Sequence, residues 1–422
     1  MKLSDAVLIR KDPILLKQVR QMAPDFWWIE GWFPNVFFGQ HVCSNAYLVK
    51  DDRNLVLIDN GRGPVMMEKL VSLIDAYAGQ VDRLYMTLTQ AHLDHAGNNE
   101  ILDEHAIGET HFVLNERERP VLEFALDWVA DFKAREPYYD WREDLSPILP
   151  LIPAIGKHSR ELADMAVQNI VAMAYGGLVS KREQVEPLRM DECRDFTFGS
   201  VTVKGWPLGR LVLIPDCAHS PGHVSIYDPE FKIMIAGDVT IEINPVLMYS
   251  SVNGLIRYNG FYKTMAEEGY IEMAGDGHRS QSNWGQEVLA RFPDDLRDKV
   301  REGDYIVGRD NCIRFFELFE RFHRDQRDAV IAAHRNLGPA KVSDIAEAVR
   351  NRDEWGIRFM RATHSCLAAF PYPWRHLVCG ILLEQGCRSA AADDGYPRFE
   401  PAETVTDEPR DTVPWRQDSP AA

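Results

Sequence analysis

The segment Thr89-Gln90-Ala91-His92-Leu93-Asp94-His95-Ala96-Gly97 places four metal-binding side chains within six residues. It directly follows the β-like run Leu84-Tyr85-Met86-Thr87-Leu88. Because side chains alternate along an extended strand, Gln90 and His92 point to one side, and the following turn can direct Asp94 and His95 to a second point. A polar strand-to-helix turn is the alternative, since a lone histidine is usually structural. Three metal-binding residues at this spacing disfavour it, and the segment predicts two neighbouring metal positions.

The segment resembles the metallo-β-lactamase superfamily motif His-x-His-x-Asp-His-x-Gly, with Gln90 where the first histidine is expected. Two runs upstream, 45–49 and 54–61, look like the opening strands of that fold. The second run contains Asp59, which the resemblance places behind the metal-binding loop as a support for the ligands.

Two later motifs of the superfamily follow in the expected order. Residues 216–225, Asp-Cys-Ala-His-Ser-Pro-Gly-His-Val-Ser, resemble the third motif and imply that His219 is a ligand. The apolar run 233–236 leads to Asp238, which matches the carboxylate that bridges two metals in the family. Each motif alone is weak, because an Ala-Gly-Asp turn after a strand is common. Their order makes the resemblance strong.

Two histidines compete for the fifth ligand position. His278 ends the segment Gly275-Asp276-Gly277-His278, which matches the family's Pro-Gly-His turn, and its glycines permit the tight backbone of a ligand-bearing loop. His334 lies in the predicted helix 327–335, where an ordinary exposed histidine is the alternative. We favour His278 and keep His334 as the alternative.

The resemblance implies an α/β fold, the metallo-β-lactamase-like αββα sandwich, over residues 1–300 with a helical insert at about 115–190. From about Arg309 the pattern changes to helices, and 301–387 resembles the small winged-helix-like C-terminal domain of one group in the superfamily. Such a domain serves in packing or as a homodimer contact. Residues 388–422 hold five prolines and eight acidic against four basic residues, which predicts a disordered acidic tail.

The predicted insert is rich in apolar and aromatic side chains. Positions 121, 124, 125, 128, 129 and 132 keep helical spacing, so one helix face is buried. Tyr138, Tyr139 and Trp141 follow, and either pack on the core or form a wall over the metals, since pockets are built largely from such side chains. A second stretch, 244–262, begins shortly after Asp238 and could line the same mouth.

Composition narrows the class of protein. The net charge of −17 argues against a nucleic-acid partner, and so against the nuclease branches of the superfamily, because binding phosphates needs clustered Lys and Arg. No apolar run is long enough to span a membrane, and residues 1–12 lack the features of a secretory signal. Seven scattered cysteines without Cys-x-x-Cys spacing suit free thiols in a reducing cytoplasm.

The resemblance divides the ligands between two metals. Gln90, His92 and His219 would hold the first, and Asp94, His95 and His278 the second, with Asp238 bridging. Imidazole and carboxylate ligands without a thiolate suit Zn²⁺ best and also admit Mn²⁺ or Fe²⁺. Because an amide oxygen is a weaker zinc ligand than imidazole, a one-metal enzyme is the alternative to a binuclear centre.

These assignments predict a metal-dependent hydrolase in which a metal-bound hydroxide attacks an ester, lactone, thioester or amide. Asp94 would orient the nucleophile or carry its proton. His223 would protonate a leaving group or bind substrate, or else is a structural turn histidine. The aromatic insert favours a small-molecule substrate with an apolar or ring portion. The alternatives are a di-iron oxidoreductase or a hydrolytic dehalogenase on the same fold, and a binding protein with a decaying metal site.

Overall fold

The computed structural model describes residues 19–31, 44–123, 135–144, 151–175, 181–240, 250–278, 305–363, 372–392 and 395–409. The features predicted at 1–12, 124–132, 244–249 and 410–422 lie outside these ranges. Within them, no helix has the length and apolar character needed to cross a membrane.

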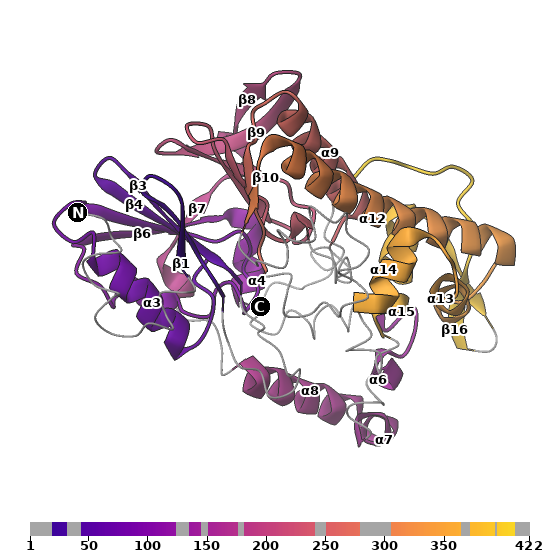
Figure 1. Cartoon of the computed structure of the whole chain (residues 1–422). Coiled ribbons are helices and arrows are strands. Elements are labelled where there is room, and N and C mark those ends of the chain that lie inside the picture. Colours follow the sequence, from indigo (N-terminus) through magenta and orange to yellow (C-terminus); the bar gives the residue numbers. More distant parts are fainter. Residues whose placement is uncertain are drawn as a thin grey trace.

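Two seven-stranded sheets form one side of the molecule in Figure 1, and the C-terminal helices lie on the other. The first contains, in spatial order, β1 (Val19–Ala23), β2 (Phe26–Ile29), β3 (Ala46–Asp51), β4 (Asn54–Ile58), β5 (Arg83–Thr87), β6 (Glu109–Asn115) and β7 (Val185–Leu188). The second contains β8 (Arg194–Phe198), β9 (Val201–Leu208), β10 (Leu211–Pro215), β11 (Val224–Asp228), β12 (Ile233–Ile235), β13 (Met273–Gly275) and β14 (Ile306–Val307). Strands β4 to β7 run parallel, so their carboxyl ends meet at one edge of the sheet.

The helices also follow in chain order. They are α3 (Pro64–Asp75), α4 (Arg119–Glu123), α6 (Trp141–Asp144), α7 (Leu151–His158), α8 (Arg160–Tyr175), α9 (Val252–Glu267), α12 (Arg309–Leu337), α13 (Val342–Arg350), α14 (Trp355–Thr363) and α15 (Tyr372–Glu384). Short 3₁₀ turns include η3 (Glu116–Glu118) and η6 (Gly237–Thr240).

The two faces of strand β4 show how the layers are built. Leu55 and Leu57 pack in a cluster with the apolar face of α3, whereas Val56 and Ile58 pack in a second cluster with side chains of the other sheet. Because a strand covered on both faces has no polar side, the run Leu-Val-Leu-Ile is continuously apolar. Helices therefore cover the outside of the paired sheets, which confirms the predicted αββα arrangement.

The C-terminal helices extend the core of the second sheet. Phe315, Phe316, Phe319 and Phe322 form the predicted apolar face of α12 and are buried against α9. The same buried cluster includes side chains of α13 and α15, and these helices lie beside α12 (Figure 1). Buried residues from both sides of position 301 belong to one cluster. The domain boundary predicted at that position therefore stays a prediction.

The prediction of a disordered tail from residue 388 is wrong for its first part. Strands β15 (Ser389–Ala392) and β16 (Gly395–Phe399) form a hairpin, and Phe399 is fully buried. Composition misleads here because one buried aromatic ring and main-chain pairing to Ala340 are enough to fix an otherwise polar segment.

The aromatic residues of the insert pack against the C-terminal part of the chain. Tyr139 and Trp141 are buried, the Tyr139 hydroxyl pairs with His376 Nδ1, and the ring of Tyr138 lies 5.4 Å from that of Phe399. These contacts fit the core interpretation and not the predicted wall over the metals. The sequence pattern shows that a helical face is buried, but it does not identify the surface that buries it.

Candidate metal centre

The first motif is held by a buried carboxylate at the end of β4. Asp59 accepts hydrogen bonds from the Thr89 main-chain N–H at 2.7 Å and from the Thr89 hydroxyl at 2.8 Å. It also lies 2.9 Å from His95 Nδ1. A hydrogen bond from His95 Nδ1–H to Asp59 turns the Nε2 atom of the ring towards Asp238 and Gln90, where it can serve as the ligand atom of a metal. This is the supporting role that the resemblance implied for Asp59.

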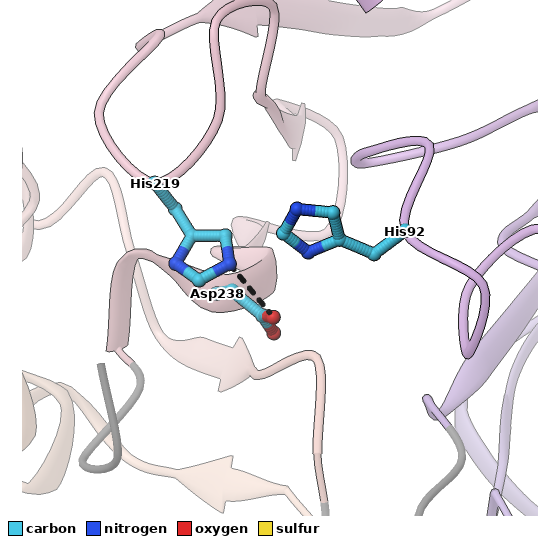
Figure 2. Close-up of side chains that lie close together, drawn as sticks. All are labelled: His92, His219 and Asp238. Carbon is cyan, nitrogen blue, oxygen red and sulfur yellow. Dashed lines mark ion pairs between the residues drawn. The ribbon is translucent and has the colours of Figure 1, made fainter. Parts of the chain in front are cut away.

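His92, His219 and Asp238 form one cluster of ligand atoms that lie within 4.8 Å of one another (Figure 2). His92 comes from the loop after β5, His219 from the loop between β10 and β11, and Asp238 from η6. The rings of the two histidines lie edge to face at 5.1 Å. Three segments that are far apart in the sequence therefore converge on one point.

Asp94, His95 and His278 form a second cluster with the same spacing. His278 Nε2 lies 3.1 Å from Asp94 Oδ2, and the rings of His95 and His278 lie 5.2 Å apart. The Asp94 and His278 side chains are 16% and 21% exposed. The second cluster is therefore reached from solvent.

Asp238 stands between the two clusters. Its Oδ2 atom lies 3.5 Å from His219 Nε2, 3.4 Å from His95 Nε2 and 3.6 Å from His278 Nε2. Burial alone would raise the pKa of this carboxyl, but His278 and His95 hold it well below its usual range. One carboxylate thus contacts ligands of both clusters, as a bridging group must.

The residues present fit a pair of divalent cations. Buried Asp238 Oδ1 and Gln90 Oε1 have no hydrogen-bond partner within the described ranges, although buried polar atoms are rarely left in that state. Burial lowers the pKa of His92 to about 4, so this ring is neutral and able to bind a metal. Burial would lower the pKa of His95 as well, but the carboxylates of Asp59, Asp238 and Asp94 raise it to about 10. This concentration of negative charge is what a bound cation would neutralise.

The resemblance groups Gln90 with His92 and His219, but the structure places its side-chain amide beside Asp238 and His95. Its Nε2 atom is 2.5 Å from Asp238 Oδ2 and 2.8 Å from His95 Nε2, so the amide contacts the bridging carboxylate and the second cluster. A half-turn about the last bond of the side chain would exchange the amide nitrogen for the oxygen and present a neutral ligand there. In the orientation that the structure shows, the amide nitrogen of Gln90 donates a hydrogen bond to Asp238.

The loop that carries His278 is tightly packed against its surroundings. The main-chain N–H of Asn45 donates to the Gly277 carbonyl at 2.7 Å, and the Gly277 N–H donates to the Gly237 carbonyl at 3.0 Å. A Cβ atom on Gly277 would lie 2.0 Å from Asp238 Oδ1, so only glycine fits there. His334, by contrast, lies in α12 and hydrogen-bonds the Phe399 carbonyl at 2.9 Å. The structure brings His278 to the clusters, and His334 is a buried helix histidine rather than the exposed one expected.

His223 is enclosed on both sides of its ring. Its Nδ1 lies 2.8 Å from Asp216 Oδ2, and its Nε2 accepts the main-chain N–H of Asp238 at 3.0 Å. Both nitrogens are thus engaged in a fully buried site. The proton-donor role predicted for His223 does not fit this geometry, and the structural alternative does. Its function is to set the backbone that carries Asp238.

Glu118 is a supporting residue that the sequence analysis missed. Its buried carboxylate accepts hydrogen bonds from the Ala91 N–H at 2.7 Å, the Ser220 hydroxyl at 2.5 Å and the Gly222 N–H at 2.7 Å. It therefore joins the loop of His92 to the loop of His219. One sequence feature points to Glu118: it follows the strand β6, which runs parallel to β5. The residues that follow these two strands therefore lie at the same edge of the sheet.

Replacing His278 by alanine should remove metal from the second cluster and lower turnover by orders of magnitude in a folded protein. His334→Ala should keep the metal and lose about 1 kcal/mol of unfolding free energy, because it removes one hydrogen bond to the Phe399 carbonyl, which still accepts the Ala340 N–H at 3.1 Å. Metal analysis and denaturant unfolding of both variants test this. The reverse pattern would place the ligand in the C-terminal helices.

Glu118→Gln should weaken zinc retention about 10- to 100-fold, the usual effect of losing a support behind a ligand, because an amide NH₂ would face one of the three donors. Glu116→Gln is the matched control, since Glu116 lies in the same 3₁₀ turn as Glu118 but accepts the N–H of Met190 at 3.0 Å and not one from a ligand loop. A competition titration with a chelator measures both. Equal retention in the two variants would exclude the proposed support.

Gln90→His should hold metal more strongly against a chelator than the unmodified protein, because zinc prefers imidazole nitrogen to an amide oxygen. His92→Ala, which removes a ligand, is the control for loss. If Gln90→His and the unmodified protein release metal identically across the titration, Gln90 is not a ligand.

The chain was compared with known proteins by sequence and by structure. The family model of the metallo-beta-lactamase superfamily matches residues 43–311. The comparison with curated protein sequences found no match. Similar solved structures include a beta-lactamase domain protein from Burkholderia ambifaria, with 15% identity and a TM-score of 0.51, over 94% of this chain and 97% of that one.

Two further solved structures have TM-scores just below 0.5. A metallo-beta-lactamase family protein from Thermus thermophilus has 16% identity and a TM-score of 0.48, over 90% of this chain and 100% of that one. The inverting sec-alkylsulfatase Pisa1 from Pseudomonas sp. has 11% identity and a TM-score of 0.49, over 87% of this chain and 50% of that one. At these identities the likenesses concern the fold alone. The family match covers more than half of the chain, which therefore belongs to the metallo-β-lactamase superfamily.

Proposed function

We propose that the protein is a metal-dependent hydrolase of a small organic substrate and cleaves an ester, lactone, thioester or amide. The single observation that supports this most is the position of Asp238 between two three-residue ligand clusters. Members of the superfamily are commonly hydrolases, and such clusters are what they use to hold divalent metals.

The ligand set favours zinc, with a pair of ions as the proposed state. When bound, a metal pair supplies Lewis acidity, which lowers the pKa of a shared water towards 7 and stabilises negative charge on the substrate. Imidazole and carboxylate donors suit Zn²⁺ and admit Mn²⁺ or Fe²⁺. The neutral Gln90 in place of an imidazole keeps a one-metal enzyme as the alternative.

The chain's own residues supply orientation and proton transfer. Asp94 is the ligand carboxylate that reaches solvent, and its Oδ2 atom contacts His278 Nε2. We assign it the role of orienting the nucleophile and holding its proton, because His223 is closed off by Asp216 and Asp238. Asp59 and Glu118 hold the ligand loops in place and do not touch the substrate.

Charge and cysteine content set the proposed context. The net charge of −17 disfavours a nucleic-acid substrate. The five cysteines within the described ranges are free thiols, which suits a reducing cytoplasm. An apolar or ring-containing substrate was predicted from the insert, but Tyr139 and Trp141 pack inside the core, so the proposal is limited to a small organic molecule.

Metal analysis of the purified protein, followed by a panel of esters, lactones, thioesters and amides, tests this proposal. We expect two equivalents of zinc and hydrolysis of at least one class, with turnover reduced by orders of magnitude in Asp238→Ala. An Asp238→Ala protein that holds no metal but turns over substrate as fast as the unmodified protein would contradict the proposal. Bound iron with visible absorption would favour the di-iron oxidoreductase, and halide release from haloalkanes the dehalogenase.

A further inference from the structure

The start of helix α9 fixes the backbone on which His219 stands. The Ser251 main-chain N–H donates to the Ala218 carbonyl at 2.7 Å, and the Ser250 hydroxyl donates to the His219 carbonyl at 2.6 Å. A Cβ atom on Gly254 would approach the Ala218 side chain to 3.0 Å, so the helix lies directly against this loop. Any shift of the helix start would therefore move His219.

This helix start is capped by a residue from the far end of the chain. Glu384, at the end of α15, accepts the Ser251 hydroxyl through Oε1, and the N–H groups of Val252 and Asn253 through Oε2 at 3.0 and 3.3 Å. These partners are separated from Glu384 by 131 to 133 residues in the sequence. A carboxylate here also lies at the positive end of the helix dipole.

No residue within α9 can replace Glu384 in this role. The Ser251 hydroxyl already accepts the Gly254 N–H at 2.9 Å, as an N-cap does, which leaves the first two helical N–H groups without a local acceptor. Val252 and Asn253 are buried, so water does not satisfy them. An unpaired buried donor is costly, and the helix start would shift if Glu384 were removed.

A second set of contacts secures the same corner. The Asn253 side-chain amide donates to the carbonyls of Thr406 and Glu408 at 3.0 and 2.9 Å. Gln385, next to Glu384, exchanges two hydrogen bonds with the main chain of Thr406. The end of α15 and the segment that follows the C-terminal hairpin thus both close over the N-terminus of α9.

We propose that Glu384 is a positioning residue for the metal centre, which acts on His219 through Ser251 and Ser250. The C-terminal helices would then be part of the scaffold of the first ligand cluster and not a separable module. This inference rests on the proposed function, because it assumes that His219 binds a metal. It assigns to Glu384 no contact with substrate.

The test compares zinc retention in three variants of the full chain. Glu384→Ala should weaken retention at the first cluster about 10- to 100-fold, the range seen when a support behind a ligand is lost. Glu384→Gln should restore most of it, because its amide oxygen can accept the two N–H groups while its NH₂ donates to the Ser251 oxygen. The matched control is Glu320→Ala: Glu320 joins α12 to Lys263 of α9 at 2.6 Å but lies away from His219. This variant should lose stability and keep its zinc.

Chelator competition measures retention, and the absorption spectrum of the cobalt-substituted protein reports the ligand geometry independently. If Glu384→Ala does not fold, Ser250→Ala replaces it, because it cuts the link to His219 without exposing the cap. The inference would be overturned if Glu384→Ala or Ser250→Ala kept both the zinc retention and the cobalt spectrum of the unmodified protein. It would also be overturned if Glu320→Ala lost as much zinc as Glu384→Ala. An unmodified protein that binds none of zinc, manganese or iron would instead refute the proposed function.

Discussion

The structure depends on one constraint: five side chains from the loops of two different sheets must gather around the carboxylate of a sixth, Asp238. Neither sheet carries a complete set, because His92, Asp94 and His95 follow β5 of the first sheet, whereas His219, Asp238 and His278 belong to the second. The packing of the two sheets through their shared core therefore determines whether the site exists. A metal pair would in turn join the two halves, so its binding would be coupled to folding.

Buried carboxylates hold the ligand loops from behind. Asp59 fixes the ring of His95, Asp216 fixes His223 beneath Asp238, and Glu118 joins the loops of His92 and His219. Each accepts two or more hydrogen bonds in a dry environment, where an unpaired acceptor would be costly. The ligand geometry thus depends as much on these acids as on the ligands themselves, and Glu384 extends the pattern to the C-terminal helices.

The sequence predicted the parts of the site that are local or that follow a known order. The spacing from Gln90 to His95 and the ordered motifs around His219 and Asp238 identified residues that the structure places together. The hydrogen-bond partners of Glu118 and Glu384 could not be predicted, because the residues beside them in the sequence do not show from which N–H groups they accept hydrogen bonds. For the same reason the sequence left two interpretations open for the aromatic residues near Tyr139, core packing and a wall over the metals, and the structure fits the first. Gln90 shows a further limit, because a motif position gives the residue type but not the direction of its amide.

The most direct test of this account is an anomalous diffraction map, recorded at the zinc edge from crystals of the protein grown with zinc. The account predicts two peaks, one among His92, His219 and Asp238 and the other among Asp94, His95 and His278, with Asp238 touching both. A single peak at either cluster would support the one-metal alternative. Zinc peaks elsewhere in the protein, with no metal at either cluster and the six side chains in unchanged positions, would contradict the account.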